Sequence, residues 1–355
     1  MASNNQRPHT SIQPNRVLLA GSPGFSLDLI NKALNINGQP KLVVPSRENQ
    51  LFRRRYHFTI GTPLLKKPMD KWTKADATAL QTNSINDLNA MEIASAAAHR
   101  QGKTLLALAD PAILMNPASE GWAELPATPR PVPPKVWEAL NVRDGLEPAK
   151  PLKLVNPATF TTPAADSADR LYSPMNQTVL PDAYLESWRM IFIIVDPVKA
   201  FPAAYRGLCR YVNEGKIHRD MLGPVYKLLM NLRWTSALHT WCVLQSKRPA
   251  PLVIDEADLL RPETGVAARI CDELGLDKCI IPNPRVAPRV NGRGQASVNA
   301  PAPRVKVEGK NAFEVRIAAH RANWEVEFGE KNAKMIEECV RDAMPRYHRL
   351  FANKL

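Results

Sequence analysis

The chain has 355 residues, of which 45% are hydrophobic, and its formal net charge is +13. No apolar run approaches the roughly 20 residues that a membrane-spanning helix needs, and the polar start "MASNNQRPHTSIQPN" lacks the apolar core of a signal peptide. These features predict a cytoplasmic globular protein without a membrane partner. The charge is spread thinly and no nucleic-acid recognition motif accompanies it, so we expect no nucleic-acid binding. The five cysteines form no CxxC pair, which predicts neither a metal site nor a disulfide framework.

The first third of the chain predicts two strands with helices around them. "RVLLA" (16–20) is typical of a buried strand, and the loop "GSPGFS" leads from it into a helix over 26–35. A helix over 89–102 precedes a second strand at 103–110. Residues 1–15 are expected to be disordered, and the proline-rich residues 116–165 are expected to form an irregular insertion.

The pattern is clearer in the second half of the chain. "RMIFIIV" (189–195) predicts a strand that is buried on both faces, and "PLVIDEADLL" (251–260) predicts another that ends in acids. We expect helices around these strands as follows: 180–188 with Asp182 as N-cap, 196–215, one long helix over 221–246, 263–276 closed by Gly275, and one or two helices over 321–353. The basic residues within 283–308 are expected to lie in a flexible loop.

Alternating helices and continuous apolar strands indicate an α/β fold with a central, mainly parallel sheet covered on both faces. We expect residues 16–355 to form a single domain.

Two local features allow two interpretations each. Asp255, Glu256 and Asp258 indicate helix capping or, less favoured, a magnesium site. The aromatic residues are expected in the core, with an apolar pocket as the alternative; they are Trp188, Trp234, Trp241 and Tyr205.

Four stretches together resemble the fungal sulfotransferase-like P-loop family: residues 176–206, 231–241, 251–277 and 324–350. The resemblance implies a three-layer sulfotransferase-like fold and the cosubstrate 3′-phosphoadenosine 5′-phosphosulfate (PAPS). In the family, the loop after the first strand holds the phosphosulfate with a Lys or Arg that follows a proline.

The phosphosulfate loop of this chain departs from the family pattern. Gly24 follows the proline here, where the family has the cation. Ser22 and Ser26 remain as possible contacts for a small anion, and Asp28 opposes one. The leaving group of a sulfonate transfer accumulates negative charge, so the missing cation argues against this reaction.

The 3′-phosphate site implied by the resemblance departs as well. Val195 and Ala203 stand where the family has Arg and Ser, and Asp196 adds a negative charge. Lys199 and Arg206 are the possible partial substitutes, although a surface ion pair is the favoured role of Arg206.

The third departure concerns the base that deprotonates the acceptor. Relatives carry an acidic-His pair in a strand before an apolar stretch with proline, and "YHFTIGTPLL" (56–65) is our alignment to it. This alignment places Ile60 and Gly61 at the pair, with His57 as a possible substitute.

These departures lead to one hypothesis and two alternatives. We expect an enzyme of fungal specialised metabolism that has lost PAPS dependence, needs no cofactor and acts on a small, largely apolar substrate by acid/base-assisted cyclisation, isomerisation or dehydration. Its candidate catalytic residues are Asp28, His57 and Asp196. The alternatives are a genuine PAPS-dependent sulfotransferase that uses Lys199 and Arg206, and a non-catalytic binding or scaffold protein. The oligomeric state is left open.

Overall fold

The computed structural model of the chain describes residues 16–21, 30, 33–44, 51–117, 172–173, 175–245, 250–259, 261, 264–278 and 310–355. Residues 1–15 and the whole predicted basic loop lie outside these residues, as does most of the predicted insertion.

Five strands form one sheet in the order β2-β3-β1-β4-β5, and every neighbouring pair is parallel. Their bounds are β1 Arg16–Gly21, β2 Leu42–Val43, β3 Thr104–Ala109, β4 Arg189–Ile194 and β5 Leu252–Asp255. All side chains of β4 after Arg189 are buried, as the continuous apolar run predicts for a central parallel strand.

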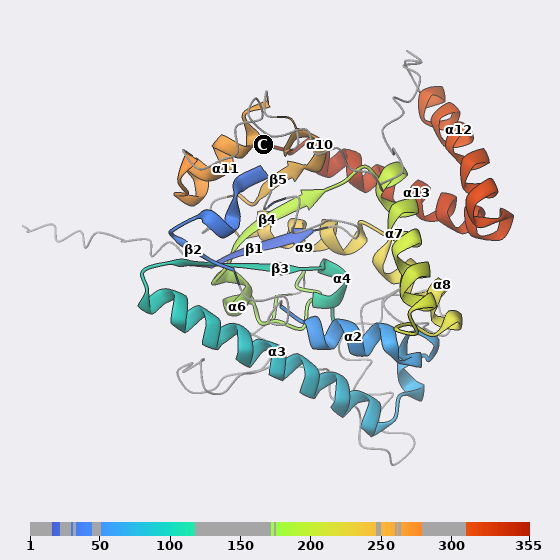
Figure 1. Cartoon of the computed structure of the whole chain (residues 1–355). Coiled ribbons are helices and arrows are strands. Elements are labelled where there is room, and N and C mark those ends of the chain that lie inside the picture. Colours follow the sequence, from blue (N-terminus) through green and yellow to red (C-terminus); the bar gives the residue numbers. More distant parts are fainter. Residues whose placement is uncertain are drawn as a thin grey trace, which may run out of the picture.

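Helices cover both faces of this sheet (Figure 1). Those between β2 and β4 are α2 Arg53–Gly61, α3 Lys74–Arg100, α4 Pro111–Leu114 and α6 Asp182–Glu186. Those after β4 are α7 Pro197–Asn213, α8 Leu222–Leu229, α9 Arg233–Leu244, α10 Glu256–Leu259, α11 Val266–Leu274, α12 Lys310–Phe328 and α13 Glu330–Phe351.

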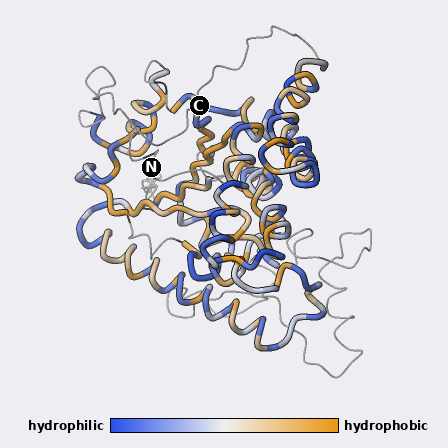
Figure 2. Tube along the Cα trace, turned by 45° about the vertical axis from the view of Figure 1, so that its right-hand side comes forward, coloured by the Kyte–Doolittle hydropathy of each residue, from blue (hydrophilic) through white to orange (hydrophobic). Residues whose placement is uncertain are grey.

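The alternation of side chains along the strands separates two cores. Leu18, Phe192 and their neighbours on one face pack against α2, α3, α6 to α9 and α13. Leu19 and Ile193 on the other face pack against α11 and the segment that contains Ile36. Figure 2 shows the hydrophobic residues gathered along the strands in the interior, with hydrophilic residues along the outer helices. The layers are therefore helix, sheet, helix, which confirms the predicted α/β class.

The predicted strands at 16–20, 103–110, 189–195 and 251–260 are confirmed in position and in their parallel arrangement. The helix over 263–276 is confirmed as α11, and Gly275 closes it with φ 64°, a conformation that costs glycine little. The four aromatic residues that were candidates for a pocket are at most 3% exposed and belong to the core.

Three local predictions are wrong. Residues 53–61 form helix α2, so the stretch 56–65 is not a strand. The helix predicted over 221–246 is divided into α8 and α9 at Met230–Leu232. Asp182 lies in the first turn of α6 rather than at its N-cap. Its carboxylate accepts hydrogen bonds from the Ser173 N–H and the Asn176 amide instead of capping the helix.

One arginine of the basic run "FRRRYH" (52–57) lies in the core, whereas Arg54 and His57 are exposed. Arg55 is fully buried and donates to the Met115 carbonyl at 2.7 Å. The buried Asp87 carboxylate accepts from the Arg55 backbone N–H and from the Arg54 guanidinium, at 3.0 and 3.1 Å. Burial lowers the pKa of Arg55 to about 9 and raises the pKa of Asp87. Each charge is therefore costly to bury alone, and the opposite charge beside it offsets part of this cost.

We expect Asp87→Ala to lower the free energy of unfolding by about 3 kcal/mol, because it leaves the buried Arg55 without its counter-charge. Arg54 is the matched control, since its half-exposed side chain reaches the same carboxylate. Arg54→Gln is expected to cost less than about 1 kcal/mol. Urea unfolding of both variants measures the difference, and equal losses would contradict this view of Asp87.

Candidate active site at the carboxyl ends of the strands

The carboxyl ends of the parallel strands meet at one edge of the sheet, where open α/β folds bind their ligands. The register places Ala20 of β1 beside Ala109 of β3, and Gly21 beside Ile193 of β4. Ile194 in turn lies beside Asp255 at the end of β5. The residues that follow these strand ends are therefore the candidates for chemistry.

Asp110 follows β3 directly, and its carboxyl group lies at this edge. It is the N-cap of α4, where its Oδ1 accepts from the Ala112 backbone N–H at 2.9 Å. The residue keeps some exposed surface, but the protein around its carboxyl removes water and raises its pKa to about 7. A carboxyl group with this pKa exchanges a proton readily near neutral pH.

The raised pKa of Asp110 makes the folded state bind more protons than the unfolded chain between roughly pH 4 and pH 7. The contribution of this group to stability is therefore lost as the pH rises through that window. Asn also caps helices well, so Asp110→Asn keeps the cap and removes the charge. We expect the variant to be more stable than the parent by about 1–3 kcal/mol at pH 8 and equally stable at pH 4. Thermal unfolding at both values tests this, and a variant that is less stable at pH 8 would contradict it.

Asp196 begins α7 immediately after β4. Its Oδ1 accepts from the Val198 backbone N–H at 3.1 Å, so Asp196 is the N-cap of this helix. Its Oδ2 is bound by the guanidinium of Arg316, on α12. The preceding Val195 is 8% exposed. An internal ion pair and a buried aliphatic side chain thus stand where the resemblance implies a phosphate and its arginine.

Asp255 ends β5 and links it to two other elements. Its Oδ1 accepts from the Ala257 N–H at 2.8 Å, which confirms the capping role, and its Oδ2 accepts from the Tyr347 hydroxyl at 2.6 Å. Burial and the neighbouring Asp255 raise the pKa of Glu256, while Lys199 opposes this shift. Within the described part of the chain, no group of acids, histidines or cysteines has the arrangement of a metal site.

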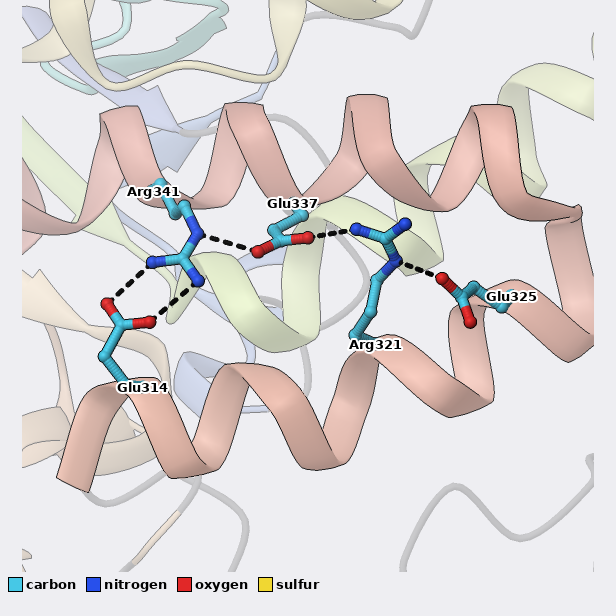
Figure 3. Close-up of polar contacts among 5 residues, drawn as sticks. All are labelled: Glu314, Arg321, Glu325, Glu337 and Arg341. Carbon is cyan, nitrogen blue, oxygen red and sulfur yellow. Dashed lines mark hydrogen bonds and ion pairs between the residues drawn. The ribbon is translucent and has the colours of Figure 1, made fainter. Parts of the chain in front are cut away.

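The hairpin of α12 and α13 brings Arg316, His320 and Tyr347 to this edge. Figure 3 shows the ion pairs between the two helices: Glu337 lies between Arg321 and Arg341, and Arg341 holds Glu314 through two contacts of 2.7 and 2.8 Å.

His320 lies among charged groups at this edge. Burial lowers its pKa, the nearby cations Arg316 and Lys199 lower it further, and Asp196 raises it. None of the three residues could be recognised from the sequence alone, because the groups that they contact lie far away in the chain.

The residues predicted for the site are only partly brought together. Ser22, Gly24, Ser26 and Asp28 lie outside the described residues. Asp196 and Lys199 both lie at the start of α7, and Lys199 is exposed there.

The other predicted residues lie elsewhere. Arg206 is held by the carboxylate of Glu327, with one contact of 2.7 Å, and its guanidinium lies 5.5 Å from the Phe328 ring. This is the surface ion pair favoured by the sequence. His57 keeps exposed surface on α2, but the protein around its ring partly removes water and lowers its pKa, and the cations Arg53 and Lys216 lower it further.

The structure also corrects the alignment of the base. Ile60 and Gly61 belong to a helix, and Ile60 is 2% exposed. The strand that runs into an apolar stretch with proline is β3, followed by "DPAIL" (110–114). Asp110 lies between this strand and the apolar stretch. The aspartate before a proline directly after a predicted strand is the signal by which the sequence could have identified it.

No helix among the described residues is both long enough and apolar enough to cross a membrane.

No family model matches the chain, and no solved structure gives a significant match. Two curated fungal proteins do match. The Sulfotransferase ppzF of Metarhizium majus is 26% identical over 209 residues, which cover 52% of this chain and 58% of the relative. The Sulfotransferase ppzF of Metarhizium rileyi is 25% identical over 200 residues, with the same coverage.

The chain thus spans little more than half the length of the curated relatives that it matches. Together with the parallel α/β sheet, the two matches support a divergent fungal sulfotransferase-like family.

Proposed function

We propose that this chain is an enzyme on a sulfotransferase-like scaffold that works without PAPS, in fungal specialised metabolism, on a small and largely apolar substrate. The feature that carries the proposal is Asp110, which follows an inner strand of the sheet, caps α4 and has its pKa raised to about 7 by burial. Its chemistry is acid/base catalysis of a cyclisation, isomerisation or dehydration.

The charges at the edge argue against a bisphosphate ligand. The described carboxyl groups there include those of Asp110, Asp196, Asp255 and Glu256, and the described cations near them include those of Lys199 and Arg316. Arg316 is already bound to Asp196. A nucleotide with two phosphate groups would have to displace this ion pair and approach several carboxylates, so its binding is unfavourable.

The proposed step uses Asp110 as the proton carrier. Its carboxylate takes a proton from one atom of the substrate and returns it to another atom, so an isomerisation leaves the enzyme unchanged and consumes no co-reactant. Tyr56 lies close enough to Asp110 that the carboxylate, after burial, is the largest contributor to the raised pKa of the phenol. The neutral Tyr56 hydroxyl is therefore a donor that supports the developing oxyanion.

The name of the two relatives, Sulfotransferase ppzF, favours a second candidate, a PAPS-dependent sulfotransferase. In that case the exposed Lys199 in the first turn of α7 is the cation available to the nucleotide. The two candidates differ in a direct way, because only the sulfotransferase needs the nucleotide.

Comparative metabolite profiling tests whether the chain is an enzyme at all. A fungal deletion strain is complemented with the parent gene or with the Asp110→Asn variant. We expect a metabolite that accumulates in the deletion strain to be consumed only with the parent gene. Equal rescue by the variant would reject Asp110 as the proton carrier, and an unchanged profile in the deletion strain would favour the scaffold alternative.

A further inference from the structure

Helix α12 is apolar on two opposite sides. On the inner side, Ile317 and Trp324 are at most 3% exposed and belong to the core beside α7 and α13. The outer side carries a stripe of aliphatic residues spaced three to four apart, as neighbours on one side of a helix are; they are Val315, Ala318, Ala319, Ala322 and Val326. All five are exposed, Val315 by 48% and Val326 by 90%. An apolar helix side is normally covered, so this aliphatic stripe is a candidate interaction surface.

The aliphatic stripe is presented at the periphery of the molecule (Figure 1). Its 12 residues, 315–326, span about 17 Å of helix. The alanines in its middle have small side chains, so another helix can approach to about 8 Å, the short end of the usual range. Two ion pairs with α7 hold α12 in place, one from Arg316 to Asp196 and one from Glu327 to Arg206. The stripe is therefore a fixed surface to which a second helix fits.

The aliphatic stripe has nearly the same pattern when it is read in reverse. Val315 and Val326 are equidistant from its centre, and so are Ala319 and Ala322. Two copies of α12 that pack antiparallel around a two-fold axis bring Val315 of one copy against Val326 of the second copy. The same arrangement brings Ala319 against Ala322. A surface that matches itself in this way is what an isologous dimer interface requires.

The charges beside the stripe fit the same antiparallel arrangement. Arg316 near the start of α12 and Glu327 near its end both lie on the side that faces α7, and each side chain is 39% exposed. The two-fold axis places Arg316 of one copy on the same side as Glu327 of the second copy, so opposite charges meet at both ends of the interface. On the side that faces α13, Glu314 and Glu325 are each bound by an arginine, which limits repulsion between the copies (Figure 3).

We infer that the aliphatic stripe is the interface of a homodimer, in which α12 packs antiparallel against α12 of a second copy. One short helix segment from each copy buries less than the roughly 1,200 Å² of a standard interface, so the dimer is weak. We expect a dissociation constant on the order of tens of micromolar. This inference goes beyond the proposed function and does not depend on it.

Sedimentation equilibrium of the full-length protein between about 1 and 300 µM tests the dimer, and the average mass should rise from monomer toward dimer across this range. Ala322→Glu places two carboxylates near the two-fold axis, where they repel each other, so association should weaken at least about tenfold. Glu is a good helix former, so this exposed change preserves α12. Ala96→Glu, the same change at an exposed position of α3, is the matched control and should associate like the parent.

Cysteine cross-linking tests the direction of the two helices. A Val315→Cys protein and a Val326→Cys protein are oxidised with diamide, separately and as a mixture, and the parent protein gives the background from its own cysteines. The antiparallel arrangement places position 315 opposite position 326 of the second copy. We therefore expect covalent dimers well above background only in the mixture.

Four results would overturn the inference: a monomer at every concentration, association that Ala322→Glu leaves unchanged, equal weakening by Ala96→Glu, or cross-linking of either cysteine variant with itself as efficient as in the mixture. The readouts are mass and cross-linking, whereas the proposed function is read from metabolites with Asp110→Asn. Failure of the dimer therefore leaves the proposed reaction untouched, and failure of the reaction leaves the dimer untouched.

Discussion

Replacing Asp110 by Asn is expected to reduce product formation by at least about 10²-fold, because the amide can neither take nor return a proton. Asn retains the cap of α4 and the size of the side chain, so the fold and substrate binding should be preserved. The measurement is the turnover of the accumulated metabolite, once profiling has identified it, by purified parent and variant. The parent rate is expected to fall as the pH drops through about 7, where the Asp110 carboxylate becomes protonated.

Asp342→Asn is the control for this experiment, since that carboxylate pairs with Arg346 on the surface of α13. It should leave turnover unchanged. An Asp110→Asn enzyme that keeps more than a tenth of the parent rate, or a parent rate that does not change around pH 7, would contradict a proton-transfer role for Asp110.

Adding two arginines at the positions where the family resemblance implies cations is expected to restore nucleotide binding but not sulfonate transfer. Gly24→Arg and Val195→Arg each add a charge-assisted contact worth roughly 1.5–3 kcal/mol, so together they should raise the affinity for adenosine 3′,5′-bisphosphate by about two to four decades. Transfer also needs a base that accepts a proton from the acceptor hydroxyl, and neither substitution supplies one.

Asp196 is expected to limit the gain in nucleotide affinity, and a third substitution controls for this effect. Asp196 is next to position 195 and already binds Arg316, so a new arginine competes for the same carboxylate. Adding Asp196→Asn keeps a helix cap and removes the competitor, and it should increase the gain in affinity further. Sulfonate transfer to a panel of phenols and alcohols, by these variants or by the parent protein, would contradict the expected loss of this chemistry. Asp110 and His57 would then be the first residues to test as the base.

The sheet was predictable from the sequence because each buried strand is a short run of apolar and β-branched residues, as in 189–195. The helix α2 was not. Its sequence "RRRYHFTIG" has no clear amphipathic pattern, and a buried arginine in it breaks the usual rule that charged residues lie outside. The contacts that hold Arg55 in place come from Asp87 and Met115, which are 32 and 60 residues away.

The same limit applies to the candidate site. The cap signals at Asp196 and Asp255 could be recognised locally, because an acid before a helix start has a local physical role. Their partners could not: Arg316 is 120 residues from Asp196, and Tyr347 is 92 residues from Asp255. The acidity of Asp110 depends on burial by elements that only the folded chain brings together.

A calorimetric titration with adenosine 3′,5′-bisphosphate decides whether the chain works without PAPS, as we propose. Purified full-length protein is titrated near neutral pH at low ionic strength, where charge attraction is strongest. We expect no saturable binding up to about millimolar nucleotide, since Gly24, Val195 and Ala203 replace the main contacts and Arg316 is bound to Asp196. A dissociation constant in the micromolar range or tighter would contradict the claim and favour a working sulfotransferase.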